Sequence, residues 1–290
     1  MSDFFKLPFL DSYALPVLGS VALVLFLLEF VVVLRTLRYN KWQRWFHNVA
    51  MSIIGLPAAR LLLLPLTFYY ASLCEQWHVG LLNWFELPFW LTSILGVLLL
   101  DYGIYLWHRL NHVIPFLWRF HNVHHADQDM DISTAIRFHF GEMLLSIPFR
   151  LVVITASGVP PVLLLIYEII FEAATLFHHS NIKLPLILER VLAFIIITPR
   201  QHGIHHSIVQ QETNSNYGTV FNWWDKLHST SRRNIPQNKI IIGVPGIRDA
   251  KENRVGPLLL LPFKKRQPEW KLPNGVVPQR EPSDESERII

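Results

Sequence analysis

The stretch HRLNHVIPFLWRFHNVHHADQ, residues 108–128, places five histidines within eighteen positions, directly after a long apolar run. The first two, His108 and His112, are four residues apart, so on a helix their rings lie on one face and can grip one metal. The other three follow the pattern H-x-x-H-H. The stretch therefore predicts a helix that leaves an apolar environment and ends in a metal-binding surface.

The composition of the whole chain indicates membrane residence. Of its 290 residues, 51% are hydrophobic and only 17% are charged. The single cysteine, Cys74, excludes an intramolecular disulfide framework and a Cys-rich zinc or iron–sulfur site, so metal chemistry must use His, Asp and Glu. The net charge of +4 is modest and forms no basic stripe, which argues against nucleic-acid binding.

Three apolar segments have the length of a membrane span, since a bilayer core of about 30 Å needs roughly 20 helical residues. They cover residues 13–34, about 51–74 and about 87–107, and we interpret the first as an uncleaved anchor rather than a signal peptide. The basic cluster after the first span predicts that its end is cytoplasmic. The third span then delivers His108 and His112 to the cytoplasmic surface.

Two shorter apolar segments follow, residues 143–157 and 160–177, separated by GVPP. They predict a hairpin that dips into the bilayer and returns, while residues 186–197 are expected to lie along the interface. The predicted fold is an all-α membrane protein with about four to five transmembrane or hairpin helices and a cytosolic histidine-rich helical cap.

The chain divides by composition into three regions. We expect N-terminal membrane anchor helices in residues 1–90, a catalytic domain in residues 91–245, and a C-terminal segment in residues 246–290. From about residue 268 that last segment is Pro-rich and charged, so it is predicted to be a mobile tail.

Eight histidines in three clusters exceed the ligands of a single zinc site, and a two-metal centre needs about this many. In each H-x-x-H-H triplet the first histidine shares a helical face with the second or third, while the adjacent pair diverges, so one triplet can serve two metals. Nitrogen donors suit Fe, Zn or Cu, and a redox function favours iron. Ordinary interfacial histidines, a haem between spans and structural zinc are the alternatives. The eight are His108, His112, His121, His124, His125, His202, His205 and His206.

The segments DYGIYLWHRLNHVIPFLWRFHNVHHADQDMDISTAIRFHFGE (101–142) and TPRQHGIHHSIVQQETNSNYGTVFNWWDKLHST (198–230) resemble the fatty acid hydroxylase / sterol desaturase superfamily of membrane di-iron enzymes. This resemblance covers roughly residues 90–230. It implies a helical bundle with a cytosolic site for two iron ions, with O2 as co-substrate, and it assigns the eight histidines as metal ligands.

The same resemblance suggests two further ligands, His139 and His179. His139 lies in RFHFGE, where Phe140 replaces the proline common in the family, and His179 precedes Ser180 in LFHHSNIKLP, with His178 as its competitor. The chain also has Ser229 where the family commonly has glycine.

Supporting roles are predicted for three polar residues outside the clusters. Asp101 lies seven residues before His108 and so on the same helical face, where it can orient an imidazole through its second nitrogen. Asn216 and Asp225 are expected to do likewise or to fix a loop. Glu168 and Glu172 are expected to be solvated in a polar crevice, to pair with Arg150, or to have a direct role.

The predicted function is O2-dependent hydroxylation or desaturation of a lipid drawn from the bilayer, with sterols, fatty acyl chains, ether lipids and carotenoids as candidates. No dinucleotide, cytochrome or ferredoxin motif is present, so electrons must come from a cytochrome b5-like protein, a ferredoxin or a reductase. The expected location is a bacterial inner membrane with a cytoplasmic site, or alternatively the endoplasmic reticulum. A non-enzymatic metal-binding or transport protein and a dihaem electron carrier are the competing hypotheses.

Overall fold

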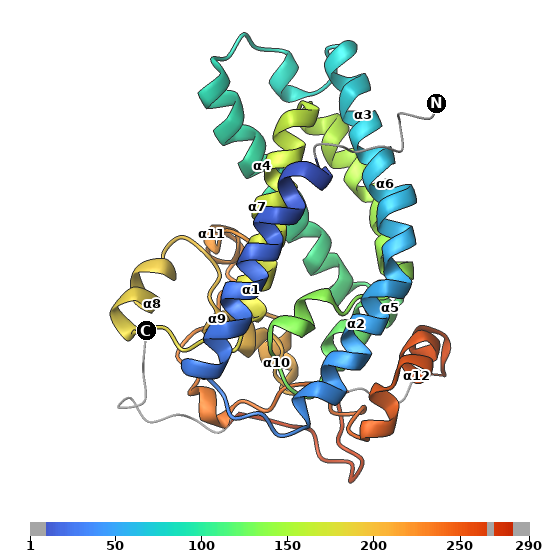
Figure 1. The fold of residues 1–290 in the computed structure, drawn as a ribbon, viewed down its shortest axis with the longest axis vertical. Helices are drawn as coiled ribbons and strands as arrows, with labels where there is room; N and C mark the ends of the chain where they lie inside the picture. The colour runs from blue at the N-terminus through green and yellow to red at the C-terminus, as the bar shows by residue number, and fades with distance from the viewer. Residues whose placement is uncertain (1–9, 266–269, 281–290) are drawn as a thin grey trace.

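The computed structural model describes residues 10–265 and 270–280, and within these ranges the chain forms helices and three isolated β-bridges but no strand (Figure 1). Five helical segments are long and apolar enough to cross a membrane. They are built from η1 (Leu10–Ala14) with α1 (Leu15–Val31), α2 (Lys41–Ala58) with η2 (Ala59–Leu63), α3 (Leu64–Gln76) and η3 (Leu81–Asn83), α4 (Phe89–Val113), α6 (Phe140–Ser157), and α7 (Pro161–His179). The all-α membrane fold expected from the sequence is confirmed.

Shorter helices gather as a cap at one end of the long ones (Figure 1). They are α5 (Pro115–His125), η4 (Ile132–Ile136), α8 (Leu186–Leu192), α9 (Pro199–His205), α10 (Gln210–Thr213), α11 (Trp223–Leu227), η5 (Gln237–Lys239), η6 (Ala250–Asn253), α12 (Val255–Leu260) and η7 (Leu261–Phe263).

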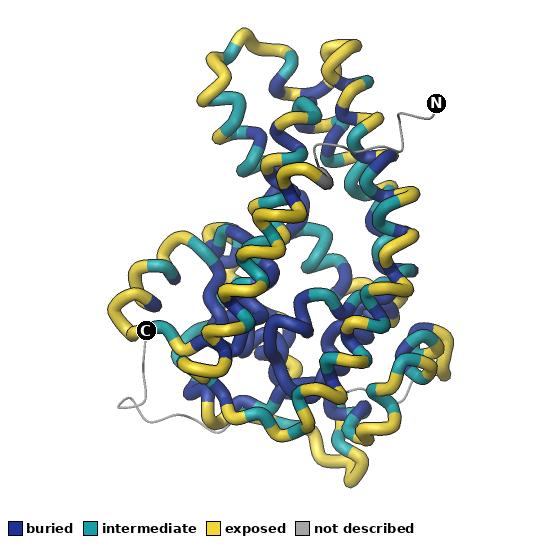
Figure 2. The backbone as a smooth tube through the Cα atoms, in the orientation of Figure 1, coloured by how far each residue is buried: buried dark blue, intermediate teal, exposed yellow. Residues whose placement is uncertain are grey.

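Burial differs sharply between the two parts. The long helices carry much exposed surface along their length, whereas much of the cap backbone is buried (Figure 2). Large apolar side chains such as Leu23, Ile53, Trp90 and Val152 are among the exposed ones. Apolar surface on this scale requires a lipid environment, because water would disfavour it. The chain is therefore an integral membrane protein.

The second membrane segment begins earlier than its apolar sequence suggested. The helix starts at Lys41 rather than near residue 51, because the Asn40 side chain caps it by accepting a hydrogen bond from the Gln43 amide. It continues through Pro57 and Pro65 with a π-helical stretch, η2, between them. The first turns of α2 thus belong to the cap.

The break between α4 and α5 determines how the histidines of these two helices lie relative to each other. Helix α4 extends to Val113, past the predicted end of the apolar span near residue 107, so that His108 and His112 lie in its last two turns, as their spacing predicted. Ile114 is extended, as expected for a residue before proline, and Pro115 then starts α5. This kink folds α5 back against α4.

Helices α6 and α7 form the predicted hairpin, but each is long enough to cross a membrane. Gly158 ends α6 with φ +69°, and a side chain on Gly80 would collide with its backbone, so the turn fits only glycine at both positions. The apolar core between α3, α4, α6 and α7 includes Ala71, Leu100 and Leu163.

Buried polar contacts tie the long helices to the cap. Glu29, the acid in the first span, accepts hydrogen bonds from the Ile132 and Asn181 amides and pairs with Lys41 at 3.0 Å. The Arg44 guanidinium donates to both carboxylate oxygens of Asp127 at 2.7 and 2.8 Å and to Asp131 at 2.8 Å. Burial alone would raise the pKa of Asp127, but the Arg44 charge outweighs it and holds this pKa well below its usual range.

Residues 270–280, expected to belong to a mobile tail, contact the cap. The Trp270 ring stacks on Trp118, with centroids 5.8 Å apart, and Arg280 donates to both carboxylate oxygens of Glu212 at 2.8 Å. The rest of the predicted tail, residues 268–269 and 281–290, lies outside the described residues.

Candidate metal centre

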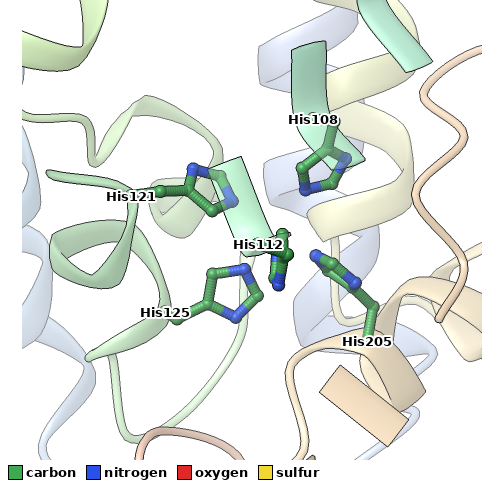
Figure 3. A group of neighbouring side chains, drawn as sticks. All are labelled: His108, His112, His121, His125 and His205. Atoms are coloured by element: carbon green, nitrogen blue, oxygen red, sulfur yellow. The ribbon is translucent and has the colours of Figure 1, made fainter. Parts of the chain in front are cut away.

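Histidines from four helices converge in two neighbouring groups where the long helices enter the cap. The first histidine group consists of His108, His112, His121, His125 and His205 (Figure 3), and the second of His124, His179, His202 and His206. Within each group, one ring nitrogen from every member lies within 4.8 Å of all the others. The two groups adjoin, since the rings of His125 and His206 stack with centroids 4.3 Å apart.

Helical geometry explains how each triplet serves both groups. Successive residues on a helix point about 100° apart, so the adjacent histidines of each triplet diverge. His124 points to the second group and His125 to the first, while His205 points to the first and His206 to the second. Adjacent residues thus become members of different groups, as the spacing predicts.

Backbone carbonyls and one carboxylate fix the orientation of the rings. The Nδ1 atom of His108 lies 2.7 Å from the Tyr217 carbonyl oxygen, and that of His205 lies 2.7 Å from the Ser215 carbonyl oxygen. His121 Nδ1 lies 2.9 Å from Glu142 Oε1. A carbonyl oxygen can only accept, so Nδ1 must carry the proton and Nε2 presents its lone pair to the group.

Every member of the first group has at least one buried ring nitrogen without a hydrogen-bond partner in the described part of the chain. An unpaired buried polar atom costs about 1–3 kcal/mol, so this many in one place indicates a missing partner. A cation that accepts all these lone pairs supplies one. The donor set therefore fits a metal.

The ring nitrogens of the second group also need a cation, because they lie close together without protons to share. The Nε2 atoms of His124 and His179 lie 3.0 Å apart, yet the Nδ1 atom of each faces a carbonyl oxygen, of Arg137 at 3.2 Å and of Thr175 at 2.8 Å. Both Nε2 atoms are therefore unprotonated and cannot hydrogen-bond to each other. The Nε2 atoms of His202 and His206 complete the set at 2.9–3.1 Å. A shared cation removes the repulsion between the lone pairs.

The electrostatics of the cap keep these imidazoles neutral. Burial, reinforced by the neighbouring imidazoles, lowers the pKa of the cap histidines well below the ordinary value of 6.5. Neutral imidazole is the form that binds metals, and it suits Fe, Zn, Cu or Ni. The affected residues are His124, His125, His202, His205 and His206.

The two additional candidate ligands have different surroundings. His179 lies in the second group. His139 lies in neither, because it caps α6: its Nδ1 accepts a hydrogen bond from the Gly141 amide at 2.9 Å, and its Nε2 lies 3.2 Å from the Leu259 carbonyl oxygen. His178 also lies outside both groups, with its Nδ1 atom 3.1 Å from the Thr219 carbonyl oxygen.

The three predicted supporting residues make no hydrogen bond to a histidine ring within the described ranges, and they hold loops instead. Asp225 accepts from the Tyr217 and Gly218 amides at 2.9 and 2.7 Å, so it places the carbonyl that orients His108. Asn216 has φ +52° and bonds to the backbone of Gln201 and Arg232. Asp101 accepts from Tyr167, Trp224 and two loop amides.

Sequence reasoning missed Glu142 and the carbonyl groups. Glu142 stands three residues after His139, and its pairing with His121 follows only from the packing of α6 on α5. The carbonyls of Ser215 and Tyr217 leave no trace in residue type, because every residue has one.

A cavity of about 200 Å³ leads from the histidines into the membrane-spanning part. Members of both histidine groups line one part of it, among them His108 and His179. Leu63, Met143 and Phe171 contribute apolar walls from η2, α6 and α7. A largely apolar cavity that borders both histidine groups fits a lipid chain.

Comparison with known proteins gives matches across this same region. Residues 93–230 match the model of the fatty acid hydroxylase family. The chain is 32% identical over 159 residues to an ornithine lipid hydroxylase of Rhizobium tropici, covering 55% of this chain and 47% of that protein. It is 28% identical to human alkylglycerol monooxygenase, covering 56% of this chain and 34% of that protein.

Mouse cholesterol 25-hydroxylase is a third relative, 28% identical over 177 residues that cover 56% of this chain and 58% of that protein. The chain thus spans from about a third to somewhat over half of the length of these relatives. No solved structure gives a significant match.

Proposed function

Residues 93–230 belong to the fatty acid hydroxylase family, and from that premise we propose that this protein is a membrane-bound oxidoreductase that uses O2 and external electrons to hydroxylate a lipid at a di-iron centre. The observation that supports this most directly is the pair of adjoining histidine groups, each with converging ring nitrogens. Hydroxylation is preferred to desaturation because the three relatives are named as hydroxylases or monooxygenases.

The proposed ligands are the nine histidines of the two groups, one group for each ion. Iron is favoured over zinc because the proposed reaction is a redox reaction. When bound, two iron ions would supply the activation of O2 and the oxidation of an unactivated C–H bond.

The residues of the chain have defined tasks in this proposal. Carbonyls of Ser215 and Tyr217 and the Glu142 carboxylate keep Nδ1 protonated and the rings fixed. The buried cap excludes bulk water from the histidines. The cavity walls hold a lipid chain so that one of its carbons lies beside both groups.

Lipid substrate and electron donor meet this protein from different sides. The exposed apolar surface of the long helices and of α8, where Ile187 is 79% exposed, is in contact with lipid in this proposal. The electron donor, of the cytochrome b5, ferredoxin or reductase class, approaches the cap. We place the protein in a bacterial inner membrane with the cap in the cytoplasm.

The test uses the full chain, purified in detergent and analysed for metal, together with lipid analysis of cells that do or do not express it. We expect close to two irons per chain and lipids that gain one oxygen atom. His205→Ala and His179→Ala should each lose the iron of their own group and the oxidation of lipid. His78 is exposed at the other end of the helices, so His78→Ala should keep both irons and the activity. Zinc in place of iron, with unchanged lipids, would reject the proposal.

A further inference from the structure

A polar stripe runs along one face of α7 inside the membrane-spanning part. Glu168, Glu172, Thr175 and His179 follow the spacing i, i+4, i+7, i+11, and all four line the cavity. With a rise of about 1.5 Å per residue, the backbone positions of Glu172 and Glu168 lie about 10 and 16 Å from that of His179 along the helix axis. The cavity therefore has acidic groups well away from the histidines.

One of these carboxyl groups lacks a partner. Arg150 Nη1 donates to Glu168 Oε1 at 2.5 Å, so these two side chains form an ion pair. Glu172, an exposed side chain on the cavity wall, makes no hydrogen bond or ion pair to any described residue, and Arg150 Nε is buried without an acceptor. An ionisable side chain inside a membrane span is costly, and so it marks a functional site.

A buried acceptor also lines the same cavity. Asn111 is 1% exposed; its amide nitrogen donates to the Trp107 carbonyl, but its Oδ1 atom has no partner in the described part of the chain. The Thr175 hydroxyl donates to the Phe171 carbonyl, so it offers no free donor. Apart from the donor Arg150 Nε, the unpaired groups named on this wall, the Glu172 carboxylate and Asn111 Oδ1, are acceptors, and a ligand that pairs with them must bring donors.

We propose that Glu172, beside the Arg150–Glu168 ion pair, binds a hydrogen-bond-donating group, an alcohol or an ammonium, on the lipid that occupies the cavity. This rests on the proposed function, because it takes a lipid as the occupant. The anchored group fixes how far along the chain oxidation occurs, since Glu172 and the histidines stand at a set separation. A hydrocarbon without a donor leaves the Glu172 carboxylate unpaired and binds more weakly.

The test compares three probes of equal chain length: a long-chain primary alcohol, the corresponding primary amine, and the methyl ether of the alcohol. Binding to the purified full chain is measured by displacement of a fluorescent alkyl probe, without reductant. We expect the wild type to prefer the alcohol or the amine over the ether by about tenfold or more, the value of a hydrogen bond to a charged group. Which of the two binds more tightly identifies the source of the donor.

Two substitutions and a control complete the experiment. Glu172→Leu should abolish the preference, and Glu172→Gln should keep it for the alcohol while reducing it for the amine. Glu75→Leu, at the exposed end of α3, should behave as wild type. If Glu172→Leu does not fold, the binding of the amine by Glu172→Gln decides the test: a reduced preference for the amine supports the proposed subsite.

Equal binding of all three probes by the wild type, or an unchanged preference in the Glu172 variants, would overturn the proposed subsite. Selective binding without any lipid oxidation in the presence of reductant and O2 would reject the proposed function and uphold the subsite. Oxidation without selective binding would do the reverse.

Discussion

Replacement of Glu142 should weaken metal binding at the first histidine group without removing a ligand. Its Oε1 atom lies 2.9 Å from His121 Nδ1, and the two side chains are only 8% and 4% exposed, so water cannot easily take its place. Removal of a group that orients a ligating imidazole costs 10–100-fold in metal affinity, or about 1.4–2.7 kcal/mol. We expect Glu142→Leu near the upper end of this range and Glu142→Gln, which retains an acceptor, near the lower end.

The assay is an anaerobic titration of metal-free protein with Fe²⁺ in competition with a chelator. His121→Ala should lose more affinity than Glu142→Leu, because it removes the nitrogen donor itself. Glu86→Gln, in an exposed loop, is the matched control and should bind metal as wild type does. Wild-type affinity in Glu142→Leu at both sites would refute the idea that this carboxylate orients a ligand.

Three further outcomes test the arrangement of the cap. His124→Ala and His125→Ala, although adjacent, should each lose a different one of two metal equivalents by elemental analysis, and the double variant should lose both; loss of both ions from either single variant would contradict two separate groups. His139→Ala should keep its metal but lose about 1 kcal/mol of stability to chemical denaturation, because a helix cap is removed, whereas His139→Asn should retain the cap; metal loss in His139→Ala would make it a ligand. Arg44→Leu should destabilise the protein by about 3–5 kcal/mol in thermal unfolding, since it leaves the buried Asp127 carboxylate with neutral donors from Asn48 and Thr134 and no cation closer than Arg137 at 3.9 Å; unchanged unfolding would show that the pair is dispensable.

The membrane helices could be predicted from the sequence because apolar length alone marks them, but their ends could not. Helix α2 begins at Lys41, in a polar stretch that hydropathy ignores, because the start is decided by the Asn40 cap and by the fit of Arg44 to Asp127. Helix α4 likewise extends past the apolar run, since His112 is stabilised by the cap rather than by lipid.

The basic cluster after the first span shows how one signal can have two causes. The charges of Arg35, Lys41 and Arg44 predict a cytoplasmic end, yet Arg35 donates to Gln237, Lys41 pairs with Glu29, and Arg44 pairs with Asp127. These residues have structural roles whatever the orientation. The side of the membrane on which the cap lies therefore stays a prediction.

The sequence predicted those features of the candidate site that depend on the spacing of histidines along a helix. The interval between His121, His124 and His125 indicates that one helix serves two groups, and the structure brings all three to their groups. His139 differs because a local role, the cap of α6, competes with ligation and is invisible in a motif. The contact between Glu142 and His121 arises from tertiary packing, so the sequence did not predict it.

The position of the two groups at the membrane edge follows from the needs of the imidazoles themselves. A ring that presents Nε2 to a metal needs an acceptor for its Nδ1 proton, and within a helix that spans hydrocarbon most backbone carbonyls are already used by the helix. Irregular segments have carbonyls to spare: one stretch supplies those of Ser215, Tyr217 and Thr219 to His205, His108 and His178 in turn. A site that needs many oriented histidines and also a lipid chain is therefore best built where the helices end, with backbone acceptors on one side and the cavity on the other.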